Sequence, residues 1–101
     1  MVVYEVGPGS DVSRPTPVKE VRATYTPEAL AARIQGGVLL TAIVLSNGTV
    51  GDVTVIRSLD TMFGLDAQAV SAAKQWLFNP GMKDGQPVAV RVTLELTFSV
   101  R

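Results

Sequence analysis

The sequence contains no cysteine and no histidine. These two absences remove the thiol nucleophile, the commonest general base and almost all transition-metal sites. The lack of cysteine leaves the redox compartment open, because a domain without disulfides is compatible with both the periplasm and the cytosol. We therefore expect a protein that is not an enzyme and that carries neither a metal nor a cofactor.

An excess of charge of either sign is also missing, because nine Lys and Arg residues balance nine Asp and Glu residues. Nucleic-acid-binding domains usually carry a basic excess or a basic stripe, often interleaved with aromatic residues. Aromatic residues make up only 6% of this chain, and no such interleaving occurs. The composition therefore argues against a nucleic-acid partner.

The chain has no apolar run of about 18 residues, and its first residues, Met1 to Glu5, do not resemble a signal peptide. Its 101 residues correspond to one domain of ordinary size. Two interpretations follow: a protein that is soluble as it stands, or a domain cut from a longer chain.

The remaining candidates for chemistry are carboxylates, and each has a simpler structural explanation. Asp66 starts a predicted helix, Asp84 belongs to a turn, and Glu95 lies on the exposed face of a predicted strand. Asp60 and Asp66 are close enough in sequence to meet, and we interpret them as loop and cap residues. Ser58 and Ser71 lack a plausible base partner.

The first 25 residues show no sustained repeat of apolar and polar residues. Val2 to Val6 is apolar enough for a short strand, which Gly7-Pro8-Gly9 would end. Residues 10–18 contain Pro15 and Pro17 and are predicted to form an extended arm.

Two helices are predicted. The first has Thr26 as its N-cap and Pro27 at its first position, and it is expected to end at Gly36 as the C′ residue. The second runs from Asp66 to about Trp76, with a buried face that includes Trp76.

Three long strands are predicted as well. Residues 38–45 and 50–58 flank Asn47-Gly48, the strongest hairpin signal in the chain, and Gly51 suggests a bulge. Residues 88–100 alternate between apolar and polar side chains over their whole length, as in a strand with one buried face.

These elements predict an α+β fold in which two helices pack on one face of a three-stranded antiparallel sheet, in the order helix, hairpin, helix, strand. Residues 38–45 form the central strand, and an extra N-terminal strand is an option. The other face of the sheet would carry Leu39, Ile43, Leu45 and Ile56. We expect residues 1–20 to cover that apolar row, with a second copy of the domain (a homodimer) as the alternative.

Several short motifs occur in the order that characterises one known family. They are Tyr25-Thr26-Pro27-Glu28-Ala29, Ile34-Gln35-Gly36-Gly37-Val38, Asn47-Gly48-Thr49-Val50, Gly64-Leu65-Asp66, Trp76-Leu77-Phe78-Asn79-Pro80-Gly81 and Asp84-Gly85-Gln86-Pro87-Val88. From Tyr25 onward, the chain resembles the C-terminal domain of the TonB energy-transducer family. The resemblance covers about three-quarters of the sequence.

The resemblance implies a domain at 25–101 preceded by an arm, residues 1–24, that ends a linker. In the family, an N-terminal anchor in the inner membrane and a proline-rich spacer precede this periplasmic domain. The domain binds the TonB box of outer-membrane transporters and is coupled through the anchor to inner-membrane motor proteins. The resemblance therefore favours the second interpretation, a domain cut from a longer chain. TonB-like domains also occur in sensors, membrane metallopeptidases and envelope scaffold proteins, which is the alternative.

The resemblance and the predicted sheet point to the same binding edge. We expect the partner peptide to add as a strand along the free edge of residues 88–100. The expected contact residues are Arg22, Ala23, Thr24, Tyr25, Val90, Arg91, Val92, Thr93, Leu94, Glu95, Leu96, Thr97 and Phe98. The alternative is that Val2–Val6 already occupies this edge and must be displaced.

The sequence departs from the family pattern at this site. Thr26 separates Tyr25 from Pro27, and Arg22, Ala23 and Thr24 replace the glutamines and proline of well-known members. Preference for a particular transporter is therefore not carried over.

Overall fold

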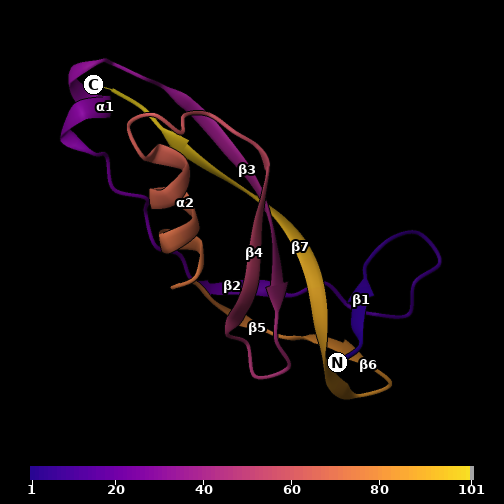
Figure 1. Cartoon of the computed structure of the whole chain (residues 1–101). Helices are drawn as coiled ribbons and strands as arrows, with labels where there is room; N and C mark the ends of the chain where they lie inside the picture. Colours follow the sequence, from indigo (N-terminus) through magenta and orange to yellow (C-terminus); the bar gives the residue numbers. More distant parts are fainter. Residues whose placement is uncertain (101) are drawn as a thin grey trace.

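The computed structural model describes residues 1–100. The molecule is elongated, with extents of 49 × 24 × 22 Å, and its long strands run along the longest dimension (Figure 1). The elements are β1 (Val3–Glu5), β2 (Thr16–Lys19), α1 (Pro27–Ala31), β3 (Gly36–Val44), β4 (Val50–Arg57), α2 (Leu65–Ala73), β5 (Leu77–Asn79), β6 (Gly81–Lys83) and β7 (Gln86–Phe98). In Figure 1, α1 and the C-terminus lie at one end, and β1, β6 and the N-terminus lie at the other.

Two sheets are present. The larger one has the order β1-β7-β3-β4, with β6 pairing to the start of β7, and the smaller one consists of β2 and β5. The neighbours β7, β3 and β4 are antiparallel, whereas β1 runs parallel to β7. The larger sheet is therefore mixed.

The predicted fold, two helices on a three-stranded antiparallel sheet, is wrong. Strands make up 45% of the chain and helices only 14%, so the structure is dominated by its sheets. The added strands β1, β2, β5 and β6 are three or four residues long. Strands this short contain too few residues to show an alternating apolar pattern. Their position is determined by pairing with residues far away in the sequence.

The predicted hairpin is confirmed. Leu45 donates its N–H to the carbonyl of Thr49, and Gly48 has the positive φ of 87° that the turn requires. The pairs Ala42↔Val53 and Val44↔Val50 leave one extra residue in β4, which is the bulge expected near Gly51.

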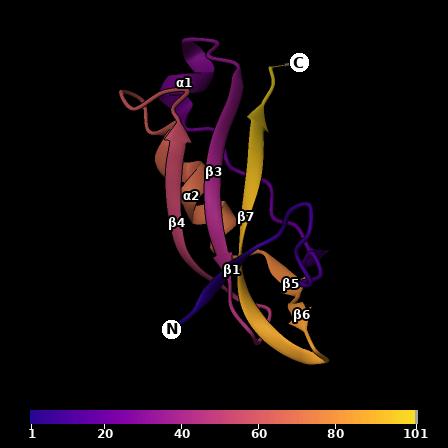
Figure 2. The ribbon, with the colours of Figure 1, turned by 90° about the vertical axis from the view of Figure 1, so that its right-hand side faces the viewer.

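The hydrophobic core lies between α2 and the sheet. Figure 2 shows α2 behind strands β4 and β3. Val38, Leu40, Ala42 and Val44 of β3 are fully buried, and Leu65 and Ala69 of α2 are buried against this side of the sheet. The small alanines of α2 allow the helix to approach the strands closely. In β7, Val90, Leu96 and Phe98 are buried as well, which confirms the buried face predicted for residues 88–100.

Both helices are shorter than predicted. Helix α1 does not continue to Gly36, because Arg33 adopts the left-handed region (φ 57°) directly after the cap residue Ala32. The N–H of Ile34 donates to the carbonyl of Ala29, and the N–H of Arg33 donates to that of Leu30. This is a Schellman ending, with Arg33 in the position expected for Gly36.

The apolar row on the other face of the sheet is only partly covered. Leu39, Ile43 and Leu45 are half-buried, but Ile56 is 52% exposed. The N-terminal arm pairs instead with β7 through β1 and with β5 through β2.

Candidate functional site

Strand β7 has one edge that is paired along most of its length and another that is largely open. Toward β3 it is paired continuously, from Val44↔Val90 to Gly36↔Phe98. On the opposite edge, β1 pairs with residues 89–91 alone. Within residues 1–100, no strand pairs with that edge from Val92 to Phe98. This stretch of backbone is the free edge of β7.

An open groove of about 350 Å³ lies along the last part of the free edge. One wall consists of residues 95–99 of β7 and its continuation, and the other consists of residues 20–23 and Tyr25. We call residues 20–25 the strap. The indole of Trp76 also lines the groove.

The strap is held in place by two aromatic side chains. The Nε1–H of Trp76 donates to the carbonyl of Val21 at 3.0 Å, across 55 positions of sequence. The Tyr25 hydroxyl donates to the carbonyl of Ile34 at 2.7 Å, and its ring packs edge-on against Phe98 with centroids 5.3 Å apart. The strap therefore runs beside β7 without pairing with it as a strand.

Trp76 sits just past the end of α2 and belongs to the core as well as to the groove. It is 8% exposed and stacks on Phe78 with ring centroids 5.9 Å apart. Its predicted burial is confirmed. Helix α2 ends at Ala73 and a turn follows. After this turn, the side chain of Trp76 reaches the strap at Val21.

A second hollow, of about 460 Å³, follows the first part of the free edge. Arg91 to Leu94 of β7 line it, opposite residues from the N-terminal arm. The arm residues are Glu5, Val6, Arg14, Pro15 and Pro17. The two hollows together follow β7 from residue 91 to residue 99.

The structure brings most of the predicted contact residues together. Arg22, Ala23, Tyr25 and Glu95 to Phe98 line the groove, and Arg91 to Leu94 line the second hollow. Thr24 is exposed but is not part of the groove lining. Val90 and Arg91 are already paired with Tyr4 and Glu5 on the outer edge, so neither belongs to the free edge, and Val90 is also fully buried.

Sequence reasoning missed several residues of the groove, namely Glu20, Val21, Trp76 and Ser99. Trp76 was placed in the core but not beside the partner edge. Its indole N–H was the available signal, because a buried tryptophan needs an acceptor for this group.

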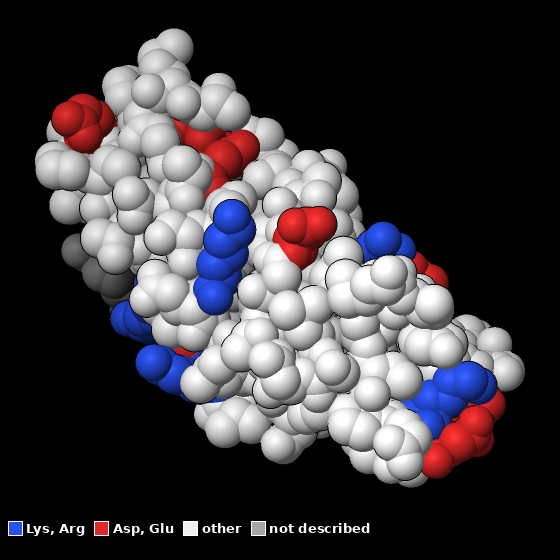
Figure 3. All heavy atoms as spheres, turned by 60° about the horizontal axis from the view of Figure 1, so that its bottom comes forward, with Lys and Arg blue, Asp and Glu red and all other residues white. Residues whose placement is uncertain are grey.

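The charged side chains at the groove are few and of both signs. Glu20, Arg22 and Glu95 line it, and Glu95 also lies 3.8 Å from the guanidinium of Arg57 on the exposed sheet face. Figure 3 shows acidic and basic residues interspersed on the face it presents. The groove therefore offers backbone groups and apolar walls more than a strong charge.

A separate polar cluster contains the two buried carboxylates, Asp60 and Asp66. Asp60 accepts hydrogen bonds from the N–H groups of Met62, Phe63 and Leu65. This carboxylate caps α2, because the N-cap residue Gly64 has no side chain to do so.

Asp66 accepts hydrogen bonds from the N–H groups of Leu59 and Asp60, both at 3.0 Å. Burial alone would raise the pKa of Asp66, but hydrogen bonds from Asp60, Ser58 and Leu59 outweigh it and lower the pKa below its ordinary value. The predicted roles as loop and cap residues are confirmed for this pair.

Residues 1–100 contain no group of three or more acidic side chains arranged to hold a metal ion. No helix in this part of the chain is both long and apolar enough to cross a membrane.

The comparisons with known proteins agree with one another. The solution NMR structure of the TonB C-terminal domain from Pseudomonas aeruginosa matches with a TM-score of 0.64 and 23% identity, over 97% of this chain and 96% of that one, which shows a common fold. The Protein TonB sequences of two strains of Xanthomonas campestris pv. campestris are each 38% identical over 76 residues, or 75% of this chain. The chain spans about a third of the length of these curated relatives (34%).

The family model described as the Gram-negative bacterial TonB protein C-terminal domain matches residues 21–100. This range contains residues 21–25 of the strap, the core cluster around α2 and the whole of β7, and it leaves β1 and β2 outside. The chain belongs to the family of TonB C-terminal domains.

Proposed function

We propose that this chain is the partner-binding domain of a TonB-type energy transducer. In this proposal it binds the TonB box of an outer-membrane transporter as an added strand along the free edge of β7. The observation that carries the proposal is the unpaired edge from Val92 to Phe98, which runs beside the groove under the strap.

The chemistry of an edge strand supports this mode of binding. Unpaired N–H and C=O groups on β7 form a template for backbone hydrogen bonds with an extended peptide. The other edge of β7 is fixed by continuous pairing with β3, so the template is rigid. A rigid template reduces the entropy that binding must overcome.

The groove supplies side-chain contacts to the same peptide. Leu96, Phe98 and Trp76 are apolar and lie along its lining, while Arg22 and Glu20 stand at the strap. Alternate side chains of an added strand would point toward this lining and away from it. Backbone pairing then provides affinity, and the alternate side chains provide the choice of partner.

The family context extends the proposal beyond the domain itself. We place the domain in the periplasm of a Gram-negative bacterium, joined through a segment outside this chain to an inner-membrane anchor and to motor proteins there. Energy-dependent uptake through the transporter is the process that this domain would support.

Calorimetric titration with a TonB-box peptide tests the binding mode. In a paired strand, only every second N–H faces the neighbouring strand. Two peptides of identical sequence, N-methylated at odd or at even positions, form a matched pair. Strand addition predicts that one set of methyl groups abolishes binding and that the other set leaves most of it. Equal binding by both methylated peptides would contradict strand addition.

A further inference from the structure

Strand β1 lies on the same edge of β7 that the proposed partner would use. Val3, Tyr4 and Glu5 pair with Ala89, Val90 and Arg91, directly before the free edge begins. Glu5 and Val6 also line the second hollow. Figure 1 shows β1 beside the first part of β7, near β6. The chain's own first strand therefore ends where the free edge starts.

The contacts that hold β1 are few and lie at the surface. Glu5 forms an ion pair with Arg91, and both side chains are solvent-exposed. The Lys83 ammonium lies 5.8 Å from the centre of the Tyr4 ring. Met1 and Val2 are 89% and 68% exposed, so they add little apolar burial. Exposed ion pairs add little to stability, and only three residues of β1 pair with β7, so β1 is a weakly held strand.

A glycine-rich turn separates β1 from a firmer anchor. Gly9 has a φ of 80°, and a Cβ at Gly7 or Gly9 would meet no atom within 4 Å. Just beyond the turn, Val12 is 7% exposed, and Ser13 exchanges two hydrogen bonds with Met82. The turn can therefore move while the chain stays anchored at residues 12–13.

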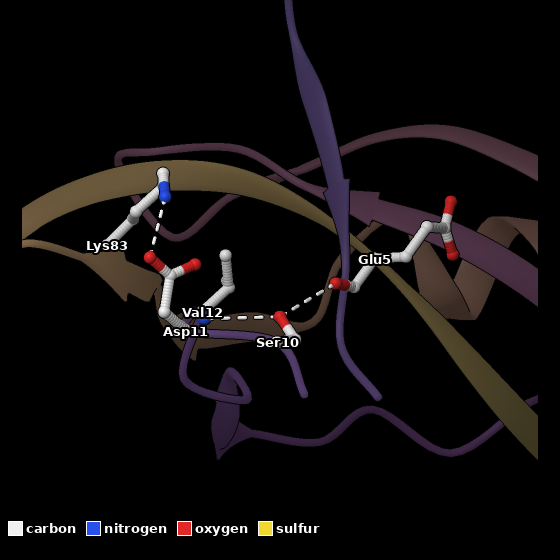
Figure 4. A network of polar contacts seen from close by, with 5 residues as sticks. All are labelled: Glu5, Ser10, Asp11, Val12 and Lys83. Atoms are coloured by element: carbon white, nitrogen blue, oxygen red, sulfur yellow. Dashed lines mark hydrogen bonds and ion pairs between the residues drawn. The ribbon is translucent and has the colours of Figure 1, made fainter. Parts of the chain in front are cut away.

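Figure 4 shows how the turn is tied to both sides. The Ser10 hydroxyl donates to the carbonyl of Glu5 at 3.3 Å and accepts from the N–H of Val12 at 3.2 Å. Lys83 and Asp11 form an ion pair at 2.8 Å on the anchored side. Of the interactions drawn, only the one between Ser10 and Glu5 reaches β1. Release of β1 would break this bond, the short pairing with Ala89 to Arg91 and the exposed ion pair with Arg91.

We propose that residues 1–9 form an intramolecular latch, in which β1 competes with the partner for the first part of the β7 edge. The inference rests on the proposed function. A partner strand of about seven residues fits the free edge beside β1, whereas one of about ten residues reaches Ala89 and must displace β1. Apparent affinity for the longer strand is reduced by the fraction of molecules in which the latch is closed.

The test compares two chains and two peptides. The full chain and a chain without residues 1–9 are titrated with TonB-box peptides of about seven and about ten residues. Removal of the latch should tighten binding of the long peptide by about tenfold, and it should leave the short peptide unchanged. Circular dichroism on the shortened chain establishes that it is folded.

A point variant tests the latch without any deletion. Glu5→Lys places a cation beside Arg91 and should tighten binding of the long peptide by about two- to fivefold. Glu28→Lys makes the same charge change on α1, far from β1 along the chain, and should leave that affinity unchanged. In the unaltered chain, the long peptide should shift the amide signals of Val3 to Glu5 toward those of an unstructured segment.

The outcomes separate the latch from the proposed function. Equal affinity of both chains for the long peptide, with the Val3 to Glu5 signals unmoved, overturns the latch and leaves strand addition intact. Failure of both chains to bind either TonB-box peptide contradicts the proposed function, and the latch falls with it.

Discussion

Replacement of Trp76 tests the structural basis of the groove, because this side chain joins the core to the strap. Its ring is 8% exposed, stacks on Phe78, and donates to the carbonyl of Val21. Trp76→Ala removes the ring from the core, which costs about 3–5 kcal/mol for a buried tryptophan. The lost hydrogen bond adds about 1 kcal/mol.

A loss of this size is a large part of the stability of a small domain, which is about 5–15 kcal/mol. Each kcal/mol lowers the melting temperature of a domain of this size by about 4–8 °C. The combined loss of at least about 4 kcal/mol should therefore lower the melting temperature of Trp76→Ala by at least about 16 °C, as followed by circular dichroism. A melting temperature within about 2 °C of the unaltered protein would refute the assignment of Trp76 to the core.

Trp76→Phe separates packing from anchoring. Phenylalanine keeps an aromatic ring in the core but cannot donate to Val21, so stability should fall by only about 1–2 kcal/mol. The strap would lose one of its two anchors, and we expect peptide affinity to fall by about fivefold because the groove is less preorganised. Unchanged affinity in a correctly folded Trp76→Phe protein would show that the strap does not need this anchor.

Three further predictions concern single positions. The pKa of Asp66 is lowered in the folded state, so the carboxylate stabilises the fold above about pH 4, and this stabilisation is lost as the pH falls through the pKa of the folded state. Asp66→Asn should flatten this dependence of the free energy of unfolding on acid pH, as measured by urea unfolding curves. Gly48→Ala should destabilise the hairpin by more than about 1 kcal/mol in the same assay, because φ is 87° there and the added Cβ would lie 2.2 Å from the Phe78 carbonyl oxygen; an unchanged midpoint would contradict the turn geometry. Arg22→Glu should alter TonB-box affinity by about two- to fivefold, whereas Lys19→Glu, which lies outside the groove lining, should not; equal effects would indicate general electrostatics rather than a groove contact.

Periodicity predicted the long elements well. The alternation in residues 88–100 and the Asn47-Gly48 turn located β7 and the β3–β4 hairpin to within two residues at each end. These signals are local, since each strand carries its own apolar pattern and the turn requires positive φ.

Sequence reasoning failed where distant contacts decide the structure. Strand β2 contains Pro17 and is wholly exposed, and it exists because it pairs with β5 across about 60 positions of sequence. Helix α1 ends early because Arg33 adopts a left-handed conformation that sequence reasoning assigned to Gly36. Neither feature has a signature in the residues around it.

At the candidate site too, the features with a local sequence pattern could be predicted, and those that depend on distant contacts could not. The edge strand could be predicted from alternation together with family resemblance, and the strap from resemblance alone. The groove depends on the bond from Trp76 to Val21, and the start of the free edge depends on the position of β1. Both contacts join segments far apart in sequence. Val90 was assigned to the binding edge because no local pattern indicates that Tyr4 already pairs with it.

The central claim, strand addition at the free edge of β7, is tested most directly by nuclear magnetic resonance on the isotopically labelled chain. A TonB-box peptide is titrated in while amide shifts and hydrogen-exchange protection are followed. The account predicts shifts and new protection along Val92 to Phe98, with smaller shifts in the strap at residues 20–25. Perturbations confined to the hairpin turn at Asn47 and Gly48 and to β4, with residues 92–98 unmoved, would contradict it.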